Sequence, residues 1–186
     1  MQTTFQVRHL AVSVGNKTLL EVPALDFPQG QTTAVIGPNG AGKSTLLRAL
    51  LGQAGRGETT LFGQPAAPQI RAGKVAWVGQ HGRYGLPMSV REYIGLAAFA
   101  HKGRPNHKLA GELLDYFDLA HLAQKRIGSL SGGEQQRANI IRALLQNAPV
   151  LLLDEPCNHL DIRHQHRLMQ YLARHKTGFS AVMVLH

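Results

Sequence analysis

The sequence predicts an α/β fold in which buried strands form a core, flanked by a small antiparallel β edge and a helical insert. A β-branched run, Thr32–Gly37, passes directly into a glycine-rich loop and a helical run. Two later apolar runs, Pro149–Asp154 and Phe179–His186, are predicted strands separated by an amphipathic helix. Strands that alternate with helices in this way are typical of α/β proteins.

The N-terminal part is expected to be β-structure. Phe5–Phe27 has a strand-like pattern with a turn at Val14–Thr18, which predicts an antiparallel edge. The β-branched composition of Thr32–Gly37 predicts a buried strand, and the run KSTLLRALLG after the loop predicts a helix. The runs GETTLFG and KVAWVG predict two more strands.

The second half is dominated by helical patterns. Composition is helical from Ser89 to Gln146, and SVRE at Ser89–Glu92 and SGGE at Ser131–Glu134 have the spacing of capping boxes. Asp161–Lys176 has the pattern of an amphipathic helix. We expect the aromatic residues of the insert to belong to its core: Tyr93, Phe99, Tyr116 and Phe117.

Length and composition indicate one globular domain. The chain has 186 residues, of which 44% are hydrophobic, and this is enough for a substantial core. Its single cysteine, Cys157, excludes an internal disulfide and fits a reducing compartment, so we expect the cytoplasm. The N-terminus lacks a secretion-signal pattern, and no apolar run approaches the ~18 residues that span a bilayer. Any role at a membrane would therefore use a partner.

The formal net charge of +9 favours anionic partners such as nucleotide phosphates, nucleic acid or an acidic lipid surface. No single run concentrates the charge, so a basic surface that is simply solvated is an equal alternative. Cys157, His159, His164 and His166 are potential metal ligands. However, the two histidines on the predicted helix are spaced i,i+2 and point apart, which argues against a metal site.

The run GPNGAGKST matches the phosphate-binding pattern G-x-x-x-x-G-K-[ST] in the required position between a strand and a helix. Its glycines let backbone N–H groups face phosphates, and the helix N-terminus adds the positive end of its dipole. We expect Lys43 to reach the outer phosphates and Ser44 to bind Mg²⁺. The predicted nucleotide-binding residues are Gly37, Pro38, Asn39, Gly40, Ala41, Gly42, Lys43, Ser44 and Thr45.

Two acidic residues end the apolar run LLLDE. We expect Asp154 at the tip of the strand, where its carboxylate can hold the metal's water shell, and Glu155 beside the terminal phosphate. Taken alone, two acidic residues in this position could equally mark a strand that simply ends at the solvent. Together with the glycine-rich loop, the pair favours a site for Mg-ATP.

The run LSGGEQQR, Leu130–Arg137, predicts a second anion site. Paired glycines at a helix start expose backbone N–H groups to an anion, and Ser131 adds a hydroxyl. A plain capping box accounts for Ser131 and Glu134 but leaves the glycines unexplained. The predicted residues of this site are Ser131, Gly132, Gly133 and Glu134.

These motifs together resemble the ATPase subunit of an ABC transporter. They are GPNGAGKST, a lone Gln80 after a strand, LSGGEQQR, VLLLDEP, NHLD and a final strand ending in His186, in matching order from about Gln6 onward. The resemblance implies a single ABC ATPase domain over residues 1–186. Its P-loop NTPase core, with the β edge, would comprise residues 1–80 and 148–186. Residues 81–147 would form a helical subdomain that carries the LSGGEQQR motif.

The resemblance also implies roles in catalysis. Glu155 would activate the attacking water, Gln80 would lie at the metal and at the contact with a membrane partner, and His186 would be a switch histidine that contacts the γ-phosphate. The ligands of Mg²⁺ would be Ser44, Gln80 and Asp154.

Two subunits of this family pair head to tail. The resemblance therefore implies that Ser131 and Gly133 of one subunit close over the ATP held at Lys43 of the other, while Asp161 crosses the interface. Hydrolysis would need a dimer, which we expect to be a homodimer.

The run NHLDIRHQHRLMQYL resembles importer ATPases for siderophores, haem, cobalamin and related metal chelates. The resemblance implies ATP and Mg²⁺ as cofactors, an integral membrane permease as partner and, indirectly, a substrate-binding protein. It implies a position on the cytoplasmic face of the membrane and no direct contact with nucleic acid.

Two departures from the family leave alternatives open. Family members usually carry an adenine-stacking aromatic residue where this chain has Val14, and they continue well past the switch histidine, so we expect a truncated form. One alternative is therefore a cassette with impaired ATPase activity that binds partners. Another is a ribosome-associated ABC translation factor, because those proteins also carry DEP-x-NHLD. They hold two cassettes, whereas this sequence has one phosphate loop.

Overall fold

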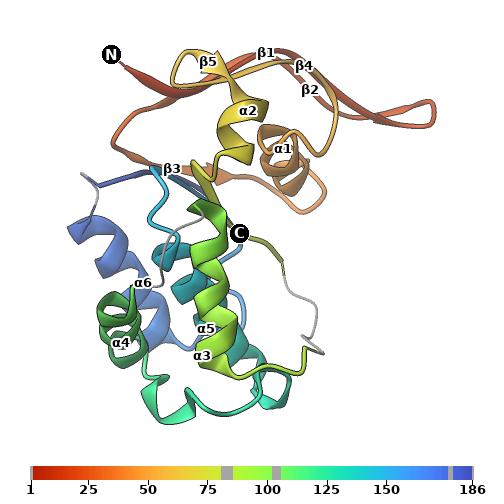
Figure 1. Cartoon of the computed structure of the whole chain (residues 1–186). Helices are drawn as coiled ribbons and strands as arrows, with labels where there is room; N and C mark the ends of the chain where they lie inside the picture. Colours follow the sequence, from red (N-terminus) through yellow and green to blue (C-terminus); the bar gives the residue numbers. More distant parts are fainter. Residues whose placement is uncertain (1, 81–85, 102–105, 176–177, 186) are drawn as a thin grey trace.

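The computed structural model describes residues 2–80, 86–101, 106–175 and 178–185. It contains two four-stranded sheets, drawn one above the other in Figure 1, with helices between and below them. The upper sheet is antiparallel, with the strand order β2-β1-β4-β5, and the lower sheet is parallel, with the order β3-β8-β7-β6. The predicted α/β class is confirmed.

The antiparallel sheet is the predicted β edge. Its strands are β1 (Thr3–Val14), β2 (Lys17–Pro28), β4 (Arg56–Leu61) and β5 (Gln64–Pro65). The β1–β2 turn contains Gly15 at a φ of 57°, a conformation that glycine adopts without strain. Phe5 and Val7 of β1 are fully buried, in one hydrophobic cluster with Leu47 of α1 (Lys43–Leu50). The helices α1 and α2 (Ala66–Arg71) lie between the two sheets (Figure 1).

The parallel sheet has β8 (Ser180–Leu185) and β7 (Val150–Asp154) at its centre and β6 (Val75–Val78) on one side. All residues of β7 are buried, as expected for a strand covered on both faces. Val150 and Leu152 face the cluster that contains α1, whereas Leu151 and Leu153 face the helices below. The sheet therefore lies between two hydrophobic clusters.

The strand β3 (Thr32–Ile36) differs from the prediction. Its residues alternate between half-buried and exposed, and Ile36 is 74% exposed. Among the described residues β3 pairs with β8 alone and thus forms the edge of the sheet. The prediction of a buried strand at Thr32–Gly37 is wrong in this respect, because Thr32, Ala34 and Ile36 point to the same face of β3 and this face is exposed.

The helical insert lies below the parallel sheet in Figure 1. Its helices, including three 3₁₀ turns labelled η, are α3 (Val90–Gly95), η1 (Leu96–His101), α4 (His107–Tyr116), η2 (Ala120–Leu122), η3 (Ile127–Ser129) and α5 (Gly132–Leu145). Both predicted capping boxes are confirmed, at the starts of α3 and α5. The amphipathic helix α6 (Ile162–Arg174) follows β7 and begins at the cap residue Asp161.

The aromatic residues of the insert are split between core and surface. Tyr93 and Phe117 are buried, and Tyr116 packs against the same cluster, as predicted. Phe99 is 80% exposed, so its assignment to the core is wrong. The 3₁₀ turn η1 buries the small side chain of Ala97 instead and directs Phe99 outward.

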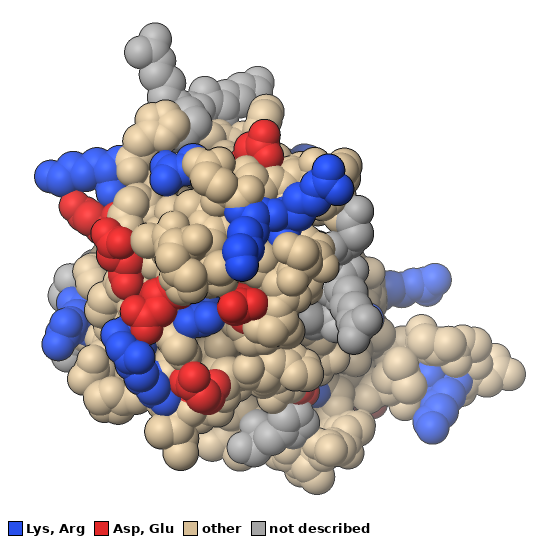
Figure 2. All heavy atoms as spheres, turned by 90° about the horizontal axis from the view of Figure 1, so that it is seen from below, with Lys and Arg blue, Asp and Glu red and all other residues tan. Residues whose placement is uncertain are grey.

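Charge is mixed on the face drawn in Figure 2, where basic side chains alternate with acidic ones. This face fits the alternative of a solvated basic surface. Among the described residues, no helix combines the length and the apolar composition that a membrane span requires.

Candidate active site

The glycine-rich loop connects β3 to α1 at the carboxyl edge of the parallel sheet, where ligands of α/β proteins usually bind. Gly40 and Gly42 have φ values of 80° and 85°, which only glycine adopts readily, and Gly42 is the residue before α1. Lys43 is 8% exposed and donates hydrogen bonds to the carbonyl oxygens of Gly37 and Pro38, at 2.6 and 2.9 Å. The ammonium group of Lys43 thus bonds back to the first two residues of its own loop.

The predicted metal-binding side chains meet at the end of β7. Asp154 is 1% exposed, and its Oδ1 accepts a hydrogen bond of 2.9 Å from the hydroxyl of Ser44. The amide Nε2 of Gln80 lies 3.3 Å from the same Ser44 hydroxyl. Three segments that are far apart in the sequence therefore place oxygen-bearing side chains within one hydrogen-bonded cluster.

Glu155 occupies a strained position directly after this strand. Its φ is 50°, which is uncommon for a residue other than glycine, and its backbone N–H donates to the carbonyl oxygen of Val184 on β8. Gln80 donates to one carboxylate oxygen of Glu155 at 2.7 Å, and Asn158 donates to the other. The carboxylate is thus held from two sides beside Ser44. Sequence reasoning missed Asn158, although its position three residues after Glu155 in a turn was a usable signal.

A cavity of about 480 Å³ opens in front of the loop and is lined by Leu19, residues 39–45, Gln80 and Glu155. Sequence reasoning also missed Leu19, which reaches the cavity from β2. Gly42 lies under this strand, since a Cβ on it would contact Leu20 at 3.3 Å. Val14 is 67% exposed and is absent from the cavity wall, so its effect on adenine stacking stays a prediction.

The start of α5 forms its own hydrogen-bonded turn, away from this cavity. Glu134 Oε2 accepts hydrogen bonds from the backbone N–H and the hydroxyl of Ser131, at 2.7 and 2.8 Å. Burial acts to raise the pKa of Glu134, but these bonds lower it overall. A Cβ on Gly133 would lie 2.6 Å from the carbonyl oxygen of His159, so glycine is required there by the chain's own packing. The capping box alone did not explain this glycine.

Asp161 is exposed and follows two residues after His159, whose carbonyl oxygen lies against Gly133. Its Oδ1 accepts hydrogen bonds from the backbone N–H and the ring Nδ1 of His164, both at 2.8 Å. The backbone bond is the main reason why the pKa of Asp161 lies below its ordinary value. His186 lies outside the described residues.

Cys157, His159, His164 and His166 are the potential metal ligands that the sequence places close together along the chain. His164 is buried and His166 is exposed, so these two side chains do point apart. Within the described ranges no three His, Cys, Asp or Glu side chains are close enough to hold a metal ion together. Cys157 is half-buried, and burial raises the pKa of its thiol.

The sequence pattern of the family described as ABC transporter matches residues 20–158. The chain belongs to this family. Hence it is an ABC ATPase, and its run Gly37–Thr45, called the P-loop below, has the sequence pattern of a phosphate-binding loop. The ABC ATPase family binds ATP.

Curated relatives cover nearly the whole ABC chain. The Hemin import ATP-binding protein HmuV of Bradyrhizobium diazoefficiens is 37% identical over 200 residues, which cover 100% of this chain and 75% of the relative. HmuV of Vibrio parahaemolyticus is 34% identical over 96% of this chain and 74% of its own length. A probable metal transport system ATP-binding protein of Chlamydia muridarum is 34% identical over 97% of this chain and 73% of its own length.

Solved structures agree with this ABC fold. A metal-chelate type ABC transporter in an inward-facing conformation superposes with a TM-score of 0.76 at 28% identity, over 100% of this chain and 74% of that one. The ATP-binding subunit of another ABC transporter superposes with a TM-score of 0.87 at 23% identity, over 99% and 80% of the two chains. The second similarity is one of fold alone.

Proposed function

We propose that this chain is the ATP-hydrolysing subunit that powers import of haem or another metal chelate through a membrane permease. The observation that carries this proposal is the cluster of Ser44, Gln80, Asp154 and Glu155 at the mouth of the P-loop, in a chain similar over its whole length to hemin importer ATPases. The geometry supports hydrolysis, and the relatives support the substrate.

Binding of ATP would begin at the P-loop. The backbone N–H groups of the loop and the N-terminus of α1 attract the phosphates, and Lys43 would exchange its bonds to Gly37 and Pro38 for bonds to phosphate oxygens. Because Lys43 is already held at the loop, little side-chain entropy is lost in this exchange. The apolar side chain of Leu19 lies in the same cavity and is available to cover the base.

The donor set at the end of β7 fits Mg²⁺, a hard cation that prefers oxygen ligands. The Ser44 hydroxyl and the Asp154 carboxylate already lie 2.9 Å apart, and the Gln80 amide can turn its oxygen toward them. The ion would neutralise charge on the phosphate oxygens. We propose Ser44, Gln80 and Asp154 as the residues that hold it directly or through water.

Glu155 is the proposed base or water-orienting group. Its carboxylate faces the cavity and is restrained by Gln80 and Asn158, so that a water molecule between it and the terminal phosphate would be held in a defined orientation. The proposed role of His186 is to contact the γ-phosphate.

The proposed partner in hydrolysis is a second copy of the chain. Ser131 and Gly133 do not line the cavity of their own P-loop, which supports a role at a partner's nucleotide. Asp161 is exposed, and the next residue, Ile162, is an exposed apolar residue, 84% accessible. Burial of this side chain in a pair would remove its apolar surface from water.

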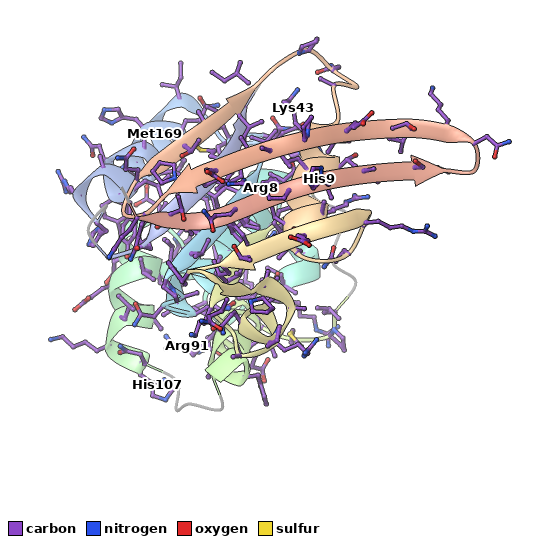
Figure 3. The ribbon with its side chains drawn as sticks, turned by 90° about the horizontal axis from the view of Figure 1, so that it is seen from above. Arg8, His9, Lys43, Arg91, His107 and Met169 are labelled. Carbon is purple, nitrogen blue, oxygen red and sulfur yellow. The ribbon has the colours of Figure 1, made fainter. Side chains whose placement is uncertain are left out.

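The proposed permease contact lies on the helical insert. An apolar cavity of about 520 Å³ is lined by Ile94, Ala97, Leu109 and Leu145 together with polar residues that include Arg91 and His107. Phe99 projects from the same helical segment. Figure 3 shows Arg91 and His107 near each other and away from Lys43, so a partner docked here would leave the P-loop open. Through this contact the chain would sit at the cytoplasmic face of the membrane, and a substrate-binding protein would act on the other side.

The experiment is to purify the tagged chain from native cells and to measure ATP turnover of the wild type and of Glu155→Gln. We expect an integral membrane permease to co-purify, and turnover to fall by about 10² to 10⁴ in the variant while ATP binding persists. Glu112→Gln, an exposed acid of α4, is the matched control and should keep full turnover. Co-purification of ribosomes in place of a permease would favour a translation factor, and a wild type without turnover would favour a partner-binding cassette.

A further inference from the structure

His164 is a buried histidine that contacts three separate elements. Only 8% of the residue is exposed. Its Nδ1 lies 2.8 Å from Oδ1 of Asp161, at the start of α6. Its Nε2 lies 2.5 Å from Nη1 of Arg137 on α5, and 3.4 Å from Oδ2 of Asp118, which follows α4. The ring therefore connects three parts of the molecule. These are Asp161 at the end of the loop after β7, α5 with the LSGGEQQR motif, and the segment that follows α4.

The partners of the ring define its tautomer. Arginine only donates hydrogen bonds and stays protonated, so Nε2 of His164 must accept from Arg137. The single ring proton of the neutral side chain is then on Nδ1, where it is donated to Asp161. Both short contacts are satisfied in this one tautomer alone.

Protonation of the ring would change this arrangement. A second proton on Nε2 would point at the guanidinium of Arg137, and a cation would then face a cation. The ring would instead bond to Asp118, whose pKa is held below its ordinary value chiefly by a hydrogen bond from Arg167. All charged groups that face the ring are then accounted for: Asp161 and Asp118 favour the protonated form, and Arg137 opposes it. Arg163 and Arg167 of α6 act on the ring through Asp118.

The contact between His164 and Arg137 belongs to a larger junction. The loop from Glu155 to Asp161 also touches α5 where the side-chain amide of Gln136 donates to the carbonyl oxygen of Pro156 at 3.0 Å. It touches α5 again at Gly133, under the carbonyl of His159. Among these ties of the described residues, only the one at His164 involves an imidazole ring, a group that can exist in a neutral and in a protonated form.

We propose that His164 is a positioning residue for ATP hydrolysis, whose neutral ring locks the loop Glu155–Asp161 to the LSGGEQQR helix and whose protonation releases that helix. This inference rests on the proposed function, because it assumes that the loop and the helix act together on ATP held between two copies. His164 touches no nucleotide-binding residue and acts through Asp161 and Arg137.

The test compares ATP turnover of the wild type, His164→Gln and His166→Gln between about pH 5.5 and about pH 8, where histidine titrates. Glutamine can offer Arg137 an acceptor at the position of Nε2 but has no titratable proton. We expect wild-type kcat to fall on the acid side by about tenfold more than that of His164→Gln, the order of one charge-assisted hydrogen bond, with the Kd for ATP unchanged. The exposed His166 is the matched control, and its variant should follow the wild type.

Identical pH profiles for His164→Gln and an active wild type would overturn the inference and leave the proposed function intact. A wild type that turns over no ATP at any pH would overturn the proposed function. The ring tautomer gives a test that requires no variant to be active. Nitrogen-15 spectra of the wild type near pH 8 should show His164 protonated at Nδ1, and protonation at Nε2 instead would refute the lock.

Discussion

At the residue scale, the space beside Gly133 is already filled. A Cβ at this position would lie 2.6 Å from the carbonyl oxygen of His159, whereas a Cβ on Gly132 would meet nothing closer than a ring carbon at 3.7 Å. We therefore expect Gly133→Ala to lower the free energy of unfolding by about 1–3 kcal/mol, because backbone must move to admit the methyl group. Urea unfolding of Gly133→Ala and of the control Gly132→Ala measures this, and equal stability of the two variants would contradict it.

Single residues also show where sequence reasoning stops. The sequence alone could predict that Lys43, Ser44 and Asp154 lie in one site. Each belongs to a motif whose spacing is typical of binding phosphate and Mg²⁺. Leu19 could not be predicted in this way, since it enters the cavity only because β2 happens to pass over the P-loop. Asn158 is bound to Glu155 through a local turn, and its position three residues after Glu155 was a signal that could have been used.

At the scale of elements, Asp118 joins the end of α4 to α6. Its carboxylate lies 2.6 Å from Arg167 and 3.3 Å from Arg163, and the pKa of Asp118 is lowered, chiefly by the hydrogen bond from Arg167. A lowered pKa in the folded state contributes stability above the unfolded-state value of about 3.9, and this is lost as the pH falls through the folded-state value.

We therefore expect Asp118→Asn to destabilise the protein by about 1 kcal/mol at pH 7 and by less near pH 3, below the unfolded-state pKa of about 3.9. Asparagine tolerates the φ of 52° at this position, so the backbone is kept. Urea unfolding at both pH values measures the difference, with the exposed Asp115→Asn as control. The same loss at both pH values would show that the carboxylate charge is not the cause.

Helix starts that depend only on neighbouring residues in the sequence were predicted correctly. Ser89 and Ser131 begin their helices as expected, because a capping box is satisfied within four residues of one chain segment. The burial of β3 was not predictable, since composition does not reveal whether a strand has one neighbour or two. The prediction that Phe99 is buried was wrong for a similar reason. An apolar side chain on a helix is buried only if another surface covers it, and the sequence does not specify that surface.

At the scale of the whole molecule, one buried hydroxyl connects the two sheets. Ser180, the first residue of β8, accepts hydrogen bonds from Thr4 of β1 at 2.7 Å and from the backbone N–H of Gly30 at 2.9 Å. Ser180 and Thr4 are 3% and 1% exposed. The strands and the antiparallel edge could be predicted from sequence, but the strand order of each sheet and a contact between residues so far apart could not.

We expect Ser180→Ala to cost about 1–3 kcal/mol of stability, because it removes a buried hydroxyl that accepts two hydrogen bonds, from Thr4 and from the N–H of Gly30, each worth about 0.5–1.5 kcal/mol. Ser13→Ala removes an exposed hydroxyl from the same antiparallel sheet and should change stability little. Thermal unfolding of both variants provides the measurement. A Ser180→Ala protein as stable as Ser13→Ala would mean that the two sheets are held together by apolar packing alone.

The short loop from Glu155 to Asp161 has a consequence for kinetics. In the proposed pair, the first residue of this loop serves the nucleotide on its own chain, while its later part rests against Gly133 and so against the neighbour's nucleotide. Binding of ATP at one site would then affect the other site through this one segment. The rate of such a pair will rise sigmoidally with ATP concentration, with a Hill coefficient above unity, and two nucleotides will be consumed in a correlated manner.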